Sequence, residues 1–115
     1  MKSPPSRGEV WLAYLDPVEG HEQGGRRPCL IFSDDLFNHG PAELVIVLPI
    51  TGKHHDIPLR IRVEPPEGGV KVTSFIMPEM IRPISTRRLL ESWGKLDGRT
   101  LATAEEHVKT LLALP

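Results

Sequence analysis

The chain has little cysteine, no long apolar run and no strong excess of charge of either sign. Its 115 residues include one cysteine, Cys29, so no internal disulfide can form, and its apolar neighbours indicate a buried thiol. The longest wholly apolar run covers residues 44–50, which is too short to span a bilayer. The formal net charge of −1 excludes a strongly cationic nucleic-acid coat, although not a local basic patch. We therefore expect a cytoplasmic protein with no membrane partner and no hydrophobic leader.

Familiar catalytic and metal-binding motifs are also missing. The sequence contains no serine-hydrolase elbow, no Walker phosphate loop and no dinucleotide fingerprint. Among the five histidines, His54 and His55 are adjacent, so in an extended loop they would point to opposite sides and chelate poorly. No third ligand stands at a zinc-like spacing. We expect no metal and no cofactor.

Short β-prone runs, separated by proline and glycine, make up most of the chain. The length predicts one domain at residues 8–115 behind a flexible leader at 1–7. Alternating apolar residues predict about six strands, with the run at 43–50 as the central one. The expected strands cover residues 9–15, 28–33, 43–50, 58–63, 70–76 and 78–84.

The other segments are read as loops and helices. Residues 34–41 are expected to form a connecting loop, and residues 86–92 a short helical turn. Thr103 followed by Glu106 fits a capping box, which predicts a C-terminal helix from that point. Its apolar face would carry Ala104, Val108, Leu111 and Leu112. The pattern predicts a mainly β (α+β) fold, a small antiparallel barrel with a C-terminal α-helix covering one open side.

The segment at 20–28 concentrates the residues best suited to chemistry. It reads Gly-His-Glu-Gln-Gly-Gly-Arg-Arg-Pro. Gly24 and Gly25 can adopt backbone angles closed to other residues and let a ligand approach the main chain. Pro28 forces Arg27 into extended geometry, which places its guanidinium where the loop becomes a strand. The alternative is a solvated hairpin loop, because such loops also favour glycine and polar residues.

Several other candidates stay open at this level. Arg60 and Arg62 share one face of an expected strand, so they form either a phosphate-binding strip or an outward-facing charged row on an edge strand. Glu22 and Glu79 are too far apart in the sequence to say whether they meet. The remaining aromatic candidates for base stacking, more often core residues, are Trp11, Tyr14 and Phe32.

The spacing of the motifs resembles the MazF/PemK toxins of bacterial toxin–antitoxin pairs. The resemblance covers almost the whole chain past residue 7, and its most specific part is the Glu-Gln-Gly-Gly-x-Arg-Pro core. The matching segments are Gly-Glu-Val-Trp at 8–11, Leu-Asp-Pro at 15–17, the loop at 20–28, Pro-Ile-Thr at 49–51, Glu-Met-Ile-Arg at 79–82, and the stretch 88–96.

This resemblance implies an SH3-like barrel, a homodimer, and a metal-independent, sequence-selective endoribonuclease that cuts single-stranded RNA. Such toxins use the 2′-hydroxyl as nucleophile, typically leave a 2′,3′-cyclic phosphate, and are inhibited by a MazE-like antitoxin. The family's principal catalytic pair carries over to Arg27 and Thr51. A fixed guanidinium also suits the negative charge that builds on a phosphorane. Because arginine stays protonated, Glu22 is the candidate general base.

Further residues are expected to contact RNA, and two of the positions depart from the family. His21 stands where the family usually has serine or another small polar residue, and a histidine there can bind phosphate or protonate the leaving oxygen. Met80 replaces the usual glutamine, which leaves the cleavage sequence undetermined. The expected RNA-binding residues are His21, Gln23, Gly24, Gly25, Glu79 and Arg82.

Two rival functions remain. A toxin of the same fold can poison DNA gyrase by protein contact, but that activity needs no phosphorane stabiliser such as Arg27. A non-catalytic SH3-like binding module is the second rival, since a fold does not determine a function.

Overall fold

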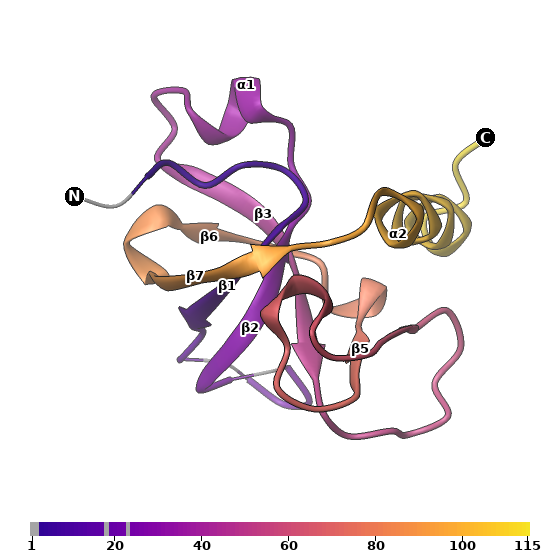
Figure 1. Ribbon diagram of the computed structural model, residues 1–115. Helices are drawn as coiled ribbons and strands as arrows, with labels where there is room; N and C mark the ends of the chain where they lie inside the picture. The colour runs from indigo at the N-terminus through magenta and orange to yellow at the C-terminus, as the bar shows by residue number, and fades with distance from the viewer. Residues whose placement is uncertain (1–2, 18, 23) are drawn as a thin grey trace.

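The computed structural model describes residues 3–17, 19–22 and 24–115. Within these residues the chain forms an antiparallel β half-barrel of seven strands (Figure 1). The strands are β1 (Glu9–Tyr14), β2 (Arg26–Ile31), β3 (Leu44–Thr51), β4 (Ile61–Val63), β5 (Ser74–Ile76), β6 (Arg82–Ser85) and β7 (Leu89–Lys95). Their order is β4-β5-β3-β2-β1-β7, and β6 pairs with β3.

Helices connect and flank these strands. The longest, α2 (Gly98–Leu111), follows the last strand, and α1 (Asp35–Asn38) is a single turn between β2 and β3. Three short 3₁₀ turns lie between the later strands: η1 (Glu67–Gly69), η2 (Pro78–Met80) and η3 (Thr86–Arg88). No helix of the described residues is long and apolar enough to cross a membrane.

Strand β3 is the centre of the structure, as its β-prone sequence predicted. One edge of β3 pairs with β2, where Cys29 lies opposite Pro49. The other edge pairs first with β6 and then, at its carboxyl end, with β5, where Thr51 lies opposite Phe75. Because β3 bridges all three neighbours, the residues at its end are brought next to segments far apart in sequence.

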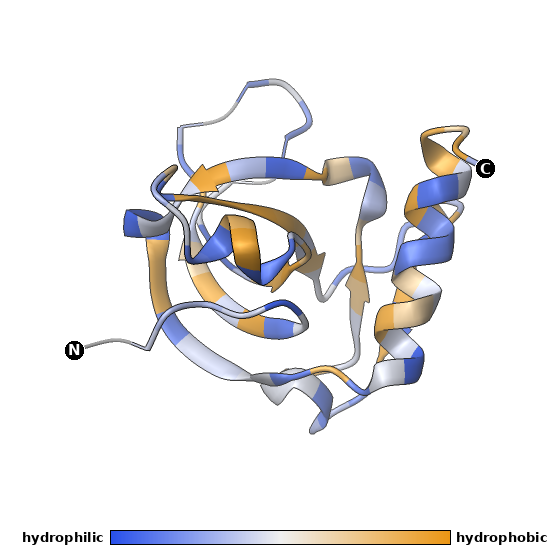
Figure 2. Cartoon of the chain, turned by 90° about the horizontal axis from the view of Figure 1, so that it is seen from above, coloured by the Kyte–Doolittle hydropathy of each residue, from blue (hydrophilic) through white to orange (hydrophobic). Residues whose placement is uncertain are grey.

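The sheet has an apolar core on each side. Successive strand residues point to opposite faces, so Val10 and Leu30 enter one cluster while Trp11 and Cys29 enter the other. Helix α2 covers the first cluster with two buried residues, Ala104 and Val108 (Figure 2). The expected mainly antiparallel β fold with a C-terminal helix is confirmed.

The expected helical turn at 86–92 is wrong beyond its first residues. Only Thr86–Arg88 turn, and the following residues form β7, which pairs with β1 along its length. The packing of the 3₁₀ turn η1 against β7 explains why the local sequence gives the wrong prediction here. Gly69 has φ +76°, and a Cβ there would lie 2.3 Å from the carbonyl oxygen of Trp93. This close approach of two backbones is a tertiary contact that propensity does not report.

The start of the C-terminal helix is also corrected. Helix α2 begins at Gly98 after Asp97, five residues before Thr103. Thr103 therefore lies inside the helix, where its hydroxyl donates to the carbonyl oxygen of Arg99 at 3.0 Å instead of capping a free amide. Leu111 and Leu112, placed on the apolar face by the sequence, are exposed.

Several expected boundaries shift. The loop at 34–41 contains α1, whose first turn is capped by the Asp34 carboxylate accepting from the amide of Leu36 at 2.9 Å. The strands expected at 58–63 and 70–76 are reduced to three residues each, and the one expected at 78–84 is divided between η2 and β6. Near the N-terminus, Pro5 is buried and the Arg7 amide donates to the Asp35 carboxylate at 2.7 Å.

Candidate active site

The glycine-rich loop holds Arg27 by its backbone. The Asp16 carboxylate accepts a hydrogen bond from the amide of Gly25 at 3.0 Å, and the Leu15 amide donates to the carbonyl of Gly25 at 2.9 Å. Gly25 has φ +71°, a conformation that favours glycine. The Arg27 Nε donates to the carbonyl of Gly24 at 2.9 Å. The terminal guanidinium nitrogens of Arg27 have no partner among the described residues and are available for a ligand.

Two further arginines fix the base of this loop. Arg88 donates through Nη1 to the carbonyl oxygens of Tyr14, at 3.1 Å, and of Asp16. Arg82 donates through Nη1 to the carbonyl of Leu15 at 3.3 Å. Three successive carbonyls at the end of β1 are therefore bound by guanidiniums from distant segments. Arg82, expected to bind RNA, has part of its donor capacity occupied by this contact.

The register of the sheet brings Arg27 and Thr51 to one face. Arg27 lies opposite Ala13, and Cys29 lies opposite Pro49. Directly paired residues share a face, and so do residues two apart on one strand. Arg27 and Thr51 thus occupy corresponding ends of β2 and β3, each two residues beyond the Cys29–Pro49 pair. Thr51 is buried, and its hydroxyl accepts from the Lys53 amide at 3.2 Å.

Cys29 lies two residues from Arg27 on β2, and its thiol is affected by the charges near the site. Burial raises the pKa of its thiol to about 12, while the charges of Arg82 and Arg27 act in the opposite direction. Both guanidiniums therefore lie close enough to influence the same sulfur atom. A raised pKa disfavours the thiolate that a cysteine nucleophile requires. Cys29 is fully buried, which confirms the expected buried thiol.

Two pockets adjoin this face. A small one of about 120 Å³ brings together Glu22 from the loop, Glu79 from η2 and Arg82 from β6, with Pro49 of β3 in its lining. A second pocket of about 350 Å³ is lined by His21, His55, Ile57, Arg60 and Met80. Met80 lines both pockets, so they are neighbours. The structure thus brings Glu22 and Glu79, whose relation the sequence left open, into one pocket.

An ion pair between Arg60 and Glu79 was missed by sequence reasoning. Arg60 Nη2 lies 2.6 Å from Glu79 Oε2, and its side chain is only 7% exposed. One atom of each partner, Arg60 Nη1 and Glu79 Oε1, is buried with no hydrogen bond among the described residues. Arg60 precedes β4, whereas Arg62 lies within it and is exposed. Arg60 therefore belongs neither to a phosphate-binding strip nor to an outward-facing row, whereas Arg62 faces outward on the edge strand β4, as one of the two alternatives predicted.

The histidines are distributed over several surroundings. His54 Nε2 lies 2.8 Å from an Asp56 carboxylate oxygen, and His39 Nε2 lies 2.7 Å from the carbonyl of Pro5. His107 is half-buried, with Nδ1 2.7 Å from the carbonyl of Leu59. Among the described residues, no group of three His, Cys, Asp or Glu side chains is arranged to hold a metal ion.

The remaining sequence candidates fall in different places. Gly24 and Gly25 are half-buried in the loop, and Gln23 lies outside the described residues. Of the aromatic candidates for base stacking, Trp11 is buried and Tyr14 is exposed. Phe32 is half-buried, and the Arg7 guanidinium lies 4.8 Å from the centroid of its ring. Tyr14 lines a groove of about 730 Å³ together with Arg26 and Arg88.

This arrangement suits the binding of a phosphate diester. Arg27 offers a preorganised guanidinium, Thr51 a hydroxyl on the neighbouring strand, and Glu22 and Glu79 offer carboxylates to one side. Donors held in place before the reaction stabilise charge that develops in a transition state without reorganising.

The chain is similar to known proteins over nearly its whole length. The sequence profile of the PemK-like, MazF-like toxin of type II toxin–antitoxin systems matches residues 6–112. Endoribonuclease EndoA of Bacillus subtilis is 32% identical over 109 residues, 94% of each chain. A crystal structure of MazF from Deinococcus radiodurans superposes with a TM-score of 0.87 at 25% identity, covering 98% of this chain and all of that one. A MazE–MazF structure from the same organism gives a TM-score of 0.81 at 25% identity, covering 99% and 100%.

Proposed function

The chain belongs to the PemK-like, MazF-like toxins of type II toxin–antitoxin systems and is an endoribonuclease; from this premise we propose that it cleaves single-stranded RNA without a metal ion, through Arg27 and Thr51. The observation that carries the proposal is the placement of these two residues at corresponding ends of β2 and β3, on one face, beside the pocket of Glu22 and Glu79.

The 2′-hydroxyl of the substrate attacks the adjacent phosphorus, and the 5′-oxygen of the next nucleotide leaves. The attack forms a 2′,3′-cyclic phosphate, and the hydroxyl proton must pass to a base while the leaving oxygen gains a proton. The free fork of Arg27 binds the non-bridging oxygens as negative charge builds on them. The Thr51 hydroxyl donates to the same phosphate or orients the attacking hydroxyl.

Glu22 is the proposed general base. It lies in the small pocket with Glu79. Glu79 is paired with Arg60, so its carboxylate is already engaged in an ion pair. The Glu22 carboxylate also accepts from the amide of Glu19 at 2.5 Å, so the loop itself orients it. His21, in the adjoining pocket, is proposed to bind a phosphate oxygen, and Gln23, Gly24, Gly25, Glu79 and Arg82 to contact the RNA chain around the cleaved bond.

The partners follow from the relatives. The Deinococcus radiodurans structure shows MazF with MazE, and we expect a cognate antitoxin of that kind to neutralise this chain. We also expect a cytoplasmic homodimer, as the family resemblance implies. The net charge of −1 suits a confined RNA groove better than a broad basic face.

Replacing Arg27 tests the proposal directly. Arg27→Ala is expected to lower single-turnover cleavage of a long single-stranded RNA at least a hundredfold, because one preorganised donor is typically worth about that much. Arg26→Ala, the adjacent arginine whose paired residue Tyr14 places it on the opposite face, serves as the matched control. Analysis of the product ends should show 2′,3′-cyclic phosphates. Near-normal cleavage by a folded Arg27→Ala protein would remove Arg27 from the chemistry.

A further inference from the structure

A third groove adjoins the end of β3 on the side away from the glycine-rich loop. It has a volume of about 350 Å³ and is lined by Gly52, His54, Arg62, Thr73 and Phe75. None of these residues belongs to the proposed catalytic set. The groove nevertheless begins at the residue that follows Thr51.

The strand register links this groove to Thr51. Thr51 lies opposite Phe75, and Phe75 lies opposite Arg62 on its other side. Directly opposite side chains share a face with their Cβ atoms about 5 Å apart. Thr51, Phe75 and Arg62 thus form a row across β3, β5 and β4. The adjoining residues Ile50, Ile76 and Ile61 face the apolar core instead.

Two residues that line the groove, His54 and Phe75, form an aromatic pair. The rings of His54 and Phe75 lie with their centroids 4.8 Å apart at an interplanar angle of 36°. The contact between His54 Nε2 and Asp56 Oδ1, 2.8 Å, restrains the imidazole. Phe75 is only half-buried, so part of its ring faces the groove. Unstacked bases of single-stranded RNA bind to such aromatic surfaces.

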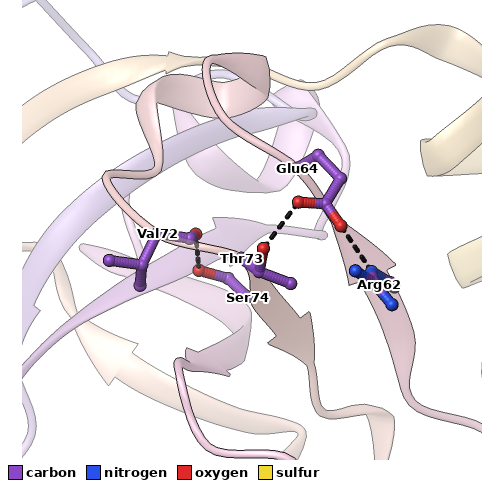
Figure 3. A network of polar contacts seen from close by, with 5 residues as sticks. All are labelled: Arg62, Glu64, Val72, Thr73 and Ser74. Carbon is purple, nitrogen blue, oxygen red and sulfur yellow. Dashed lines mark hydrogen bonds and ion pairs between the residues drawn. The ribbon is translucent and has the colours of Figure 1, made fainter.

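Arg62 and Thr73, the two polar residues of the lining besides His54, both bind the neighbouring carboxylate of Glu64. Figure 3 shows the Glu64 carboxylate between the Thr73 hydroxyl, which donates at 2.6 Å, and Arg62, which donates through Nε. These bonds from Thr73 and Arg62 lower the pKa of Glu64. Both carboxylate oxygens are therefore occupied, and the terminal nitrogens of Arg62 have no partner among the described residues. Ser74 turns away and donates to the carbonyl of Val72 at 2.7 Å.

We propose that this groove is a nucleotide-binding subsite of the enzyme, which stacks one base of the single-stranded RNA on Phe75 and His54 and contacts its phosphate through Arg62. The inference rests on the proposed role of Thr51 at the cleaved bond. It places the neighbouring nucleotide over β5, next to Thr51. Stacking tolerates every base, so the subsite adds affinity and register while leaving sequence selection to the other pockets.

Abasic substrates test the subsite without altering the protein. A series of short RNAs is made, each lacking one base near the cleavage site, and single-turnover kcat/KM is measured for each. Loss of one stacked base is expected to cost about tenfold at one flanking position, through KM. If no flanking abasic position weakens cleavage, the proposal is overturned.

Protein variants then assign that position to the groove. Phe75→Leu, which keeps an apolar side chain, should lower kcat/KM on intact RNA about tenfold and make cleavage indifferent to the sensitive abasic position. Phe37→Leu is the matched control, since Phe37 is an exposed residue of α1. His54→Ala, in an exposed loop, repeats the test if Phe75→Leu does not fold. A uniform loss on all substrates, or sensitivity unchanged in both variants, would refute the assignment.

Failure of the subsite is distinguishable from failure of the proposed function. Cleavage that depends on Arg27 but ignores abasic flanks and Phe75→Leu would leave the mechanism intact and refute the subsite alone. Cleavage that survives Arg27→Ala would refute the mechanism, whatever the abasic series shows.

Discussion

At the scale of single residues, the backbone decides what Arg27 can do. Its Nε is bound to the carbonyl of Gly24, so the terminal fork is presented in one orientation. A guanidinium on a mobile side chain would lose rotamer entropy on binding phosphate, whereas one already held loses less. In the proposed mechanism, the glycine loop would therefore contribute by holding Arg27 in place.

Two substitutions of Thr51 distinguish a chemical role of its hydroxyl from a structural one. Thr51→Ala removes a hydroxyl that accepts from the Lys53 amide at 3.2 Å, and we expect the bound cleavage rate to fall by about one to two orders of magnitude. Thr51→Ser keeps the hydroxyl and should retain most activity. Single-turnover cleavage and circular dichroism together make the measurement. Equal rates for wild type and Thr51→Ala would exclude the hydroxyl from the reaction.

His21 can be tested through the pH dependence of cleavage. A general acid must carry its proton to react, so a histidine acting as the acid at this position would make the rate fall as pH rises. We expect instead that His21 binds phosphate, in which case His21→Ser weakens RNA binding and leaves the rate at saturating enzyme nearly unchanged. A pH–rate profile of His21→Ser decides between them. Disappearance of an alkaline limb in the variant would show that His21 is the acid.

At the scale of elements, the sequence identified the strands with strong alternation and missed those defined by partners. Strands β1 and β3 follow from their apolar patterns and appear within about a residue of the expected bounds. Strand β7 contains Gly94 and several polar residues, and it exists because β1 supplies its pairing and η1 packs against its backbone. Such contacts between distant segments cannot be read from local propensity.

The same reason explains what was missed in the site. The glycine loop, Arg27 and Thr51 carry local signals in glycine, proline and strand ends. The Arg60–Glu79 pair joins residues 19 positions apart with no shared motif, and the bonds from Arg82 and Arg88 to the end of β1 span still longer separations. Only the folded structure shows that these arginines bind carboxylate and carbonyl groups of the protein itself.

The contacts of Arg88 to the end of β1 predict that its removal affects the loop that carries Arg27. Arg88→Ala removes the donor to the Tyr14 and Asp16 carbonyls, so the loop that presents Arg27 should lose order. We expect kcat to fall about tenfold and the free energy of unfolding to drop by about 1–3 kcal/mol. Arg87→Ala is the matched control, because Arg87 is exposed and its side chain has no partner among the described residues. The double variant with Arg27→Ala should be little slower than Arg27→Ala alone; additive losses would show that Arg88 acts elsewhere.

At the scale of the whole molecule, the fold alone leaves the activity open. A half-barrel with the same face could support a gyrase-directed toxin or a binding module. The sequence relatives are endoribonucleases, and the guanidinium of Arg27 on the candidate face suits the binding of a phosphate diester. The groove of about 730 Å³ beside Arg88 is larger than the pocket of Glu22 and Glu79, of about 120 Å³, and Thr51 does not line it, so volume is a poorer guide to this site than charge and register.

A chelation experiment tests the whole mechanism, because a reaction driven by fixed donors needs no metal ion. Arg27 would supply the positive charge that a divalent cation contributes in many nucleases, and no group of three potential ligands is found in the part of the chain that the structure describes. Cleavage of a long single-stranded RNA should therefore proceed at an unchanged rate in excess EDTA, while a Mg²⁺-dependent nuclease assayed in parallel stops. Loss of cleavage in EDTA, with recovery on adding Mg²⁺ or Zn²⁺, would overturn the mechanism. Intact RNA combined with blocked DNA gyrase would favour the gyrase-directed rival. Gyrase poisoning acts through protein–protein contact and does not need the guanidinium of Arg27 to bind a phosphate.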